Sequence, residues 1–260
     1  MATGVIQYKT EEEIDLMRVA GQLLARAHGE VAKLVREGVT TRELDRRAEE
    51  FIRDNGATPS FKGLYGFPYS CCLSPNSVVV HGFATDEPLI SGDILTVDCG
   101  VFLNGYHADS AYTYPIGQVS PEVQQLLKET EASLCKGIEQ AISGNRVGDI
   151  SFAIQNHVAT KGYGIVRELV GHGVGAKLHE KPEVPNYGKR GSGPMLQTGM
   201  TLAIEPMVTL GKKDVVQEKD GWTIRTRDKK PAAHFEHTVV VRKDKAEILT
   251  SFEYIEKALQ

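Results

Sequence analysis

Two stretches of this chain, 107 positions apart, share one pattern, and together they constrain the fold. Residues 92–98 read GDILTVD and residues 199–205 read GMTLAIE, so each is an apolar, strand-like run that ends in a carboxylate. The triplets HAD at 107–109 and HFE at 234–236 also correspond in kind, at a larger offset. These matches, in the same order, predict a duplicated α/β chain.

Helix signals repeat in the same way. Capping boxes over residues 10–13 and 40–43 each precede apolar residues at helical spacing. We expect strands and loops over 57–118 and 163–250, so that the order helix, helix, strands occurs twice. The chain is interpreted as a single domain, residues 1–260, with halves at about 10–118 and 119–250. The expected helices cover residues 10–38, 40–56, 120–144 and about 149–161.

The composition is that of an ordinary globular protein. Of the 260 residues 41% are apolar and 25% are charged, and the net charge is −4, which argues against a general nucleic-acid or membrane-surface binder. No window is apolar enough for a membrane span, and the N-terminus lacks a signal-peptide core, so a cytoplasmic location is expected. The four cysteines form no C-x-x-C and are expected to be buried, reduced thiols: Cys71, Cys72, Cys99 and Cys135.

A hairpin brings two carboxylates together in the first half. Asn104-Gly105 is a strong two-residue turn signal, which places Asp98 opposite Ala111 and Asp109 opposite residue 100. Both aspartates then point to the same face, about 7–8 Å apart as diagonal neighbours. They form either a metal site or two structural ionic contacts, and a divalent cation would remove the repulsion between two buried carboxylates.

The second half supplies a matching pair and the histidines. Glu205 ends one apolar run and Glu236 lies in another, while His172 and His179 sit in the glycine-rich stretch GHGVGAKLHEKP. His81 follows SVVV at an expected strand end. An oxygen-rich site with one imidazole suits manganese, iron(II), cobalt or zinc, and four carboxylates suit two ions. The remaining histidines lack such a context, although two of them could support the site from outside, His107 beside Asp109 and His234 beside Glu236; the other three are His28, His157 and His237.

Four motifs make the chain resemble the type I methionine aminopeptidases. They are DCGVFLNGYHADSA from residue 98, GHGVGAKLHEKP from 171, TLAIEPM from 201 and FEHTVVV from 235, and the resemblance covers about residues 8–250. It implies the pita-bread fold, an α/β (α+β) architecture with pseudo-two-fold halves, central antiparallel sheets and outer helices. The interval from His172 to Glu205 leaves no room for the helical insertion of the type II enzymes, and no N-terminal extension domain is expected.

The resemblance also implies a metal centre with two divalent ions, which could be cobalt, manganese, iron(II), zinc or nickel. By motif, Asp98 would bind one ion, and His172 and Glu205 would bind the other. Asp109 and Glu236 would bridge the two ions.

The implied reaction is removal of the initiator methionine when the second residue is small. Glu205 would take a proton from the attacking water, whose pKa the ions lower. His179 would stabilise the carbonyl oxygen as it gains charge, and His81 would contact the scissile amide or the next residue.

The family's methionine pocket maps onto a set of apolar residues, and this chain departs from the commonest pattern at several of them. Family members often carry Cys or Tyr where this chain has Phe61, Leu64 and Phe67, and often Phe in place of Leu178, so the pocket stays apolar but changes shape. The mapped residues are Phe61, Leu64, Phe67, Cys72, Leu178 and Trp222.

The partners implied by the resemblance are the N-terminal methionines of nascent polypeptides. A transient contact with the ribosome is left open, and a monomer with no membrane and no specific nucleic-acid partner is expected. The alternatives are a prolidase or aminopeptidase P, a metal-free binding protein on the same fold, and a metal-free creatine-type hydrolase. The complete ligand set argues against the last two.

Overall fold

The computed structural model describes residues 4–260, in which the four expected helices are present. Both predicted capping boxes are formed, by Thr10 with Glu13 and by Thr40 with Glu43. The first helix ends six residues before Gly38, and a 3-10 turn in the first half and a C-terminal helix were not predicted. The helices are α1 (Glu11–Ala32), α2 (Thr41–Asp54), η1 (Leu64–Gly66, 3-10), α3 (Pro121–Ile138), α4 (Val147–Thr160) and α5 (Glu253–Leu259).

The strands form one large sheet and two small ones. The large sheet has the order β1-β4-β5-β14-β9-β7-β8, with β2 paired to β4 and β15 paired to β14. Its strands are β1 (Thr58–Pro59), β2 (Cys71–Pro75), β4 (Ile94–Leu103), β5 (Tyr106–Pro115), β7 (Gly171–Gly173), β8 (Glu180–Val184), β9 (Thr201–Ile204), β14 (Glu236–Val240) and β15 (Glu247–Ile248). The small sheets are β13-β10-β6 (Ala232–His234, Met207–Thr209, Gly164–Ile165) and β11-β12-β3 (Val215–Gln217, Ile224–Thr226, Val78–Val80).

The predicted hairpin is present with the predicted register. β4 and β5 join at Asn104-Gly105, where both residues adopt positive φ, and Asp98 pairs with Ala111 while Gly100 pairs with Asp109. The turn chemistry alone therefore fixes which side chains of this hairpin share a face.

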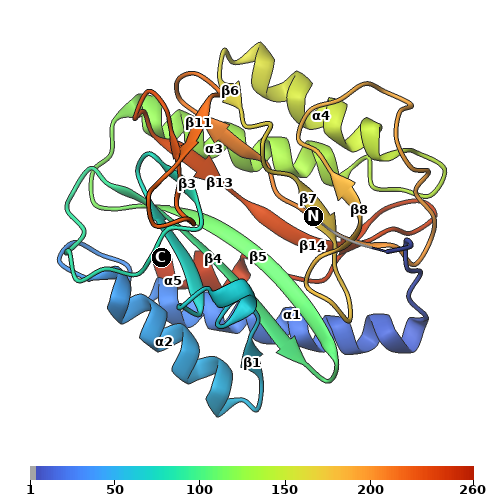
Figure 1. Ribbon diagram of the computed structural model, residues 1–260, viewed down its shortest axis with the longest axis horizontal. Helices are drawn as coiled ribbons and strands as arrows, with labels where there is room; N and C mark the ends of the chain where they lie inside the picture. Colours follow the sequence, from blue (N-terminus) through green and yellow to red (C-terminus); the bar gives the residue numbers. More distant parts are fainter. Residues whose placement is uncertain (1–3) are drawn as a thin grey trace.

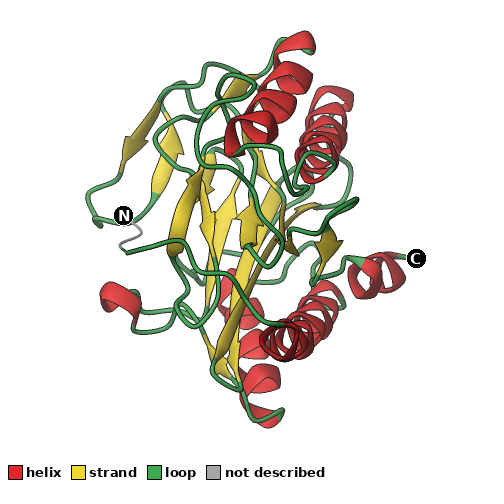
Figure 2. Ribbon diagram, turned by 90° about the vertical axis from the view of Figure 1, so that its right-hand side faces the viewer, coloured by secondary structure: helices red, strands yellow, loops and turns green. Residues whose placement is uncertain are grey.

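The long helices cover one face of the large sheet and leave the opposite face open. The long helices lie on one side and the short η1 lies on the opposite side (Figure 2). Val97, Cys99 and Val101 of β4 belong to the main hydrophobic core together with residues of α1 such as Leu24. Because side chains alternate along a strand, Asp98 points away from the helices.

Segments distant in the sequence meet at the centre of the sheet. β5 from the first half and β14 from the second half lie side by side, as Figure 1 shows for the green and red strands. The order of two helices followed by strands occurs in both halves, as the sequence predicted. Within residues 4–260, no helix is both long enough and apolar enough to cross a membrane.

The cysteine prediction is correct for three residues and wrong for one. Cys71, Cys72 and Cys99 are buried, free thiols in the large sheet, whereas Cys135 is exposed. Cys135 lies on the solvent-facing side of α3, whereas its neighbours Ser133 and Leu134 are buried.

Lys9, which precedes α1, is bonded to the chain next to His179. The backbone N–H of Lys9 donates to the Gly199 carbonyl, and the Lys9 ammonium pairs with the Glu180 carboxylate. The two side chains are only 5% and 8% exposed, and Glu180 also accepts from the Lys177 N–H. This ion pair fixes the residue directly after His179.

Removing one partner of this ion pair should cost far more than removing both. Lys9→Met leaves a buried carboxylate without its cation, so we expect the free energy of unfolding to fall by about 3 kcal/mol. The double variant Lys9→Met/Glu180→Gln should recover most of that loss. Urea unfolding measures both values.

The matched control is the exposed pair Lys257–Glu253, whose side chains are 63% and 61% accessible. Lys257→Met should change stability by less than about 1 kcal/mol. An effect of Lys9→Met as small as that of Lys257→Met would contradict the structural role of the buried pair.

Candidate metal centre and substrate pocket

Five neighbouring strands each bring one polar side chain to the open face of the large sheet. Asp98 on β4 and Glu236 on β14 both lie opposite Ala111 of β5, and Asp109 is two residues from Ala111 on the same face. Glu205 directly follows β9, and His172 lies on β7 opposite Ala203. The pairing registers therefore bring these five side chains, which come from both halves of the chain, to one place on the sheet.

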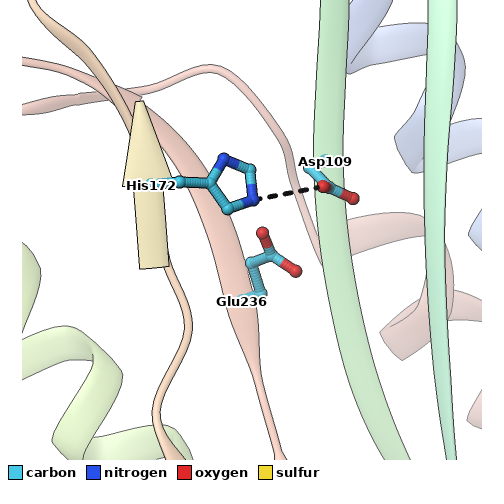
Figure 3. Close-up of side chains that lie close together, drawn as sticks. All are labelled: Asp109, His172 and Glu236. Atoms are coloured by element: carbon cyan, nitrogen blue, oxygen red, sulfur yellow. Dashed lines mark ion pairs between the residues drawn. The ribbon is translucent and has the colours of Figure 1, made fainter. Parts of the chain in front are cut away.

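The distances support a common centre. Ligand-type atoms of Asp109, His172 and Glu236 all lie within 4.8 Å of one another, and Figure 3 shows the three side chains pointing together. The His172 Nε2 atom is 3.8 Å from Asp109 Oδ2 and 3.6 Å from Glu205 Oε1. These separations are too long for hydrogen bonds and suit ligands around a cation.

The electrostatics of the four carboxylates also call for positive charge. Desolvation raises the pKa of Asp109 to about 7. Desolvation, followed by repulsion from neighbouring carboxylates, raises the pKa values of Asp98, Glu205 and Glu236. One oxygen of each of Asp98, Asp109 and Glu236 is buried without a hydrogen-bond partner among residues 4–260. A divalent cation would favour the charged forms and supply the missing partner, so these residues fit a metal.

His172 is held in a state that can bind metal. Its Nδ1–H donates to the Gly173 carbonyl at 2.8 Å, which leaves the Nε2 lone pair facing the carboxylates. Desolvation, with a smaller effect of His179, lowers the pKa of His172 to about 3, so the imidazole is neutral near pH 7.

His179 and His81 flank this centre. The His179 ring lies 4.5 Å from the His172 ring, and desolvation lowers the pKa of His179 to about 4, so it is a neutral N–H donor. His81 follows β3 with φ of 58°, an unusual conformation for histidine, and its ring lies 6.3 Å from that of Trp222. The strained backbone turns His81 out of the strand.

The apolar residues named from the resemblance form one cluster beside these histidines. Phe61, Phe67, Cys72 and Leu178 are buried together, with Leu64 and Trp222 packed against them. The Phe67 and Trp222 rings are 5.1 Å apart, edge to face. Tyr69 and Phe83, two aromatic residues that sequence reasoning missed, also pack against this cluster. Phe67 contacts both of them.

Two polar residues near the centre were not assigned a firm role from the sequence. Asn186 donates from Nδ2 to the Glu205 carbonyl at 2.9 Å and so fixes the backbone there. His234 lies beside Glu205 and Glu236, so its expected place next to Glu236 is confirmed. Asn186 carried no local signal, since its contact depends on packing across 19 residues.

The other histidines have hydrogen-bond partners outside the carboxylate cluster. Among the described residues no hydrogen bond or ion pair joins His107 to Asp109; its Nδ1 is 2.8 Å from Ser60 Oγ, and its ring packs on Phe102. The remaining three have structural partners, which are the Ser110 carbonyl for His28, Glu129 for His157 and Thr250 for His237.

Comparison of the sequence with known families gives a consistent result. Metallopeptidase family M24 matches residues 15–243. The methionine aminopeptidase of Clostridium perfringens is 53% identical over 246 residues, which cover 95% of this chain and 99% of that protein. Methionine aminopeptidase 1 of Bacillus subtilis is 48% identical, with 93% and 98% covered.

Comparison of the structure agrees. The crystal structure of the Rickettsia prowazekii methionine aminopeptidase superposes with a TM-score of 0.94 at 40% identity, covering 95% of this chain and all of that one. A prolidase from Pyrococcus furiosus shares the fold, with a TM-score of 0.77 at 24% identity, but this chain covers only 65% of it. The chain therefore belongs to metallopeptidase family M24, with its pita-bread fold, and within that family to the methionine aminopeptidases.

Proposed function

We propose that this chain is a two-metal methionine aminopeptidase that removes the initiator methionine when the second residue is small. The observation that carries the proposal is the convergence of four carboxylates and one imidazole from five adjacent strands, beside an apolar pocket. The residues that would hold the ions are Asp98, Asp109, His172, Glu205 and Glu236. When bound, divalent ions would lower the pKa of a coordinated water and polarise the carbonyl of the scissile bond.

The protein's own groups would handle binding and protons. The free α-amine of the substrate would lie near Asp98, which would restrict cleavage to the N-terminal residue. Glu205 would accept the proton of the attacking water and return it to the leaving amine. Asn186 holds the backbone carbonyl of Glu205 and thereby orients this group.

The neutral histidines would act as hydrogen-bond donors. His179 would donate N–H to the carbonyl oxygen as negative charge develops, since its low pKa keeps it uncharged and one ring N–H available. His81 would contact the scissile amide or the next residue of the substrate. The Lys9–Glu180 pair next to His179 would keep its ring in place.

Selection of methionine would come from the apolar cluster. Phe61, Phe67, Cys72 and Leu178 offer a dry slot that accepts an unbranched thioether side chain. Trp222 and Leu64 would line its sides. A bulky second residue would clash before the carbonyl reaches the metal centre.

We also propose that the substrates are nascent chains in the cytoplasm. Cys71 and Cys99 lie directly opposite each other on β2 and β4 as free thiols, which suits a reducing compartment. A prolidase activity is not favoured, because the likeness to prolidases is low in sequence and extends over part of their length.

Peptide specificity should separate these activities. Met-Ala-Ser should be cleaved with a kcat/KM at least about 100-fold above that of Met-Leu-Ser, because the larger second side chain costs several kcal/mol of clash. An Ala-Pro peptide should not be cleaved. Preferred cleavage of the Ala-Pro peptide would support the prolidase alternative instead.

Replacing His179 should reduce catalysis more than binding. We expect His179→Ala to lower kcat on Met-Ala-Ser by about 100-fold with little change in KM, because the donor acts on charge that develops in the transition state. His157→Gln, a change at a histidine on α4 that contacts Glu129, serves as the matched control. A His179→Ala enzyme with normal metal content and unchanged kcat would remove this role.

Without metal, the carboxylates should destabilise the fold at neutral pH. The pKa of Asp109 is raised from 3.8 to about 7, so the folded state keeps a proton that the unfolded state has released, and stability falls as pH rises through that window. Asp109→Asn should therefore stabilise chelated protein at pH 8, by on the order of 2 kcal/mol, and give little gain at pH 4.

Adding cobalt or manganese should reverse the order of stability. Wild-type protein should gain thermal stability on metal addition, whereas Asp109→Asn should gain much less. The buried histidines contribute equally to both proteins, so the difference isolates Asp109. Equal stabilisation of the two proteins by metal would contradict a ligand role for Asp109.

A further inference from the structure

His234 is a buried imidazole for which the described chain provides no hydrogen-bond partner. The residue is 1% exposed, and neither ring nitrogen is hydrogen-bonded within residues 4–260. A buried donor or acceptor without a partner destabilises the folded state. Its position is therefore informative about what else it binds.

The backbone directs this side chain into the metal centre. The Thr113 hydroxyl accepts from the His234 N–H at 3.0 Å and donates to its carbonyl at 2.7 Å. His234 ends β13 and Glu236 begins β14, and the residue between them, Phe235, packs in the hydrophobic core. His234 and Glu236 thus share the face opposite Phe235.

The spacing of His234 matches that of His172. The His234 Nε2 atom is 3.7 Å from Glu205 Oε2 and 3.8 Å from Glu236 Oε2. The His172 Nε2 atom is 3.6 Å from Glu205 Oε1 and 3.8 Å from Asp109 Oδ2. Glu205 therefore presents one oxygen to each imidazole. None of these four distances is short enough for a hydrogen bond. All four fit pairs of ligands that each lie about 2.0–2.2 Å from a shared ion.

We propose that His234 is a further metal ligand, which binds a cation held between Glu205 and Glu236. The inference rests on the proposed metal centre and adds a second nitrogen donor to it. A second imidazole shifts the preference of a carboxylate site from manganese towards cobalt, nickel and zinc. The assignment also accounts for the unpaired ring nitrogen that faces the two glutamates.

X-ray absorption on the cobalt-reconstituted protein tests this directly, because multiple scattering counts imidazole ligands. The wild type should show two imidazoles per metal centre, and His234→Gln should show one. Calorimetric affinity for Co²⁺ should fall by about 10-fold or more in His234→Gln, with a smaller loss for Mn²⁺. Neither readout depends on activity.

Two variants make the outcomes distinguishable. His172→Gln should also lose one imidazole from the metal centre. His28 is a buried histidine of α1, away from the carboxylates, so His28→Gln should lose none. If His172→Gln loses its imidazole while His234→Gln matches the wild type, the inference is wrong and the proposed function stands. If cobalt does not bind the wild type, or binds with no imidazole, the proposed function fails as well.

Discussion

The structure depends on holding mutually repelling carboxylates on one face of a single sheet. Asp109 and Glu236 are buried and Asp98 and Glu205 are half-buried, and desolvation raises the pKa values of all four. Such a cluster is costly without a cation and favourable with one. If the proposed metal centre is correct, the same arrangement would make the fold sensitive to metal and would supply the ligands for hydrolysis, so that stability and function would have one physical origin.

Because side chains alternate along each strand, the carboxylates share one face of the sheet while their neighbours pack in the core. Glu236 faces the centre, whereas its neighbour His237 faces the helices and stacks on Phe252. Asp109 and Ser110 are successive residues of β5, so their side chains also point to opposite faces. One face of each strand builds the core while the other carries chemistry, and a sheet locked by its core holds ligands more rigidly than loops would.

The sequence predicted the parts of the site that have local signals. Asn104-Gly105 determined the hairpin register and the capping boxes located two helices. The motifs around His172 and Glu205 pointed to side chains that the structure brings close together, and their role as ligands stays a prediction. It did not predict the partner of Lys9, which lies 171 positions away at Glu180, nor the bond from Asn186 to Glu205. The direction of the His234 ring was also hidden, because it depends on Thr113 of another strand. Such contacts follow from tertiary packing and leave no periodic trace.

Anomalous diffraction from crystals of the cobalt-loaded protein is the most direct measurement of the central claim. The account predicts two peaks on the open face of the large sheet, in contact with side chains from both halves of the chain. Peaks at other places, with no cation among Asp98, Asp109, His172, Glu205 and Glu236 in an enzyme that is active, would contradict it.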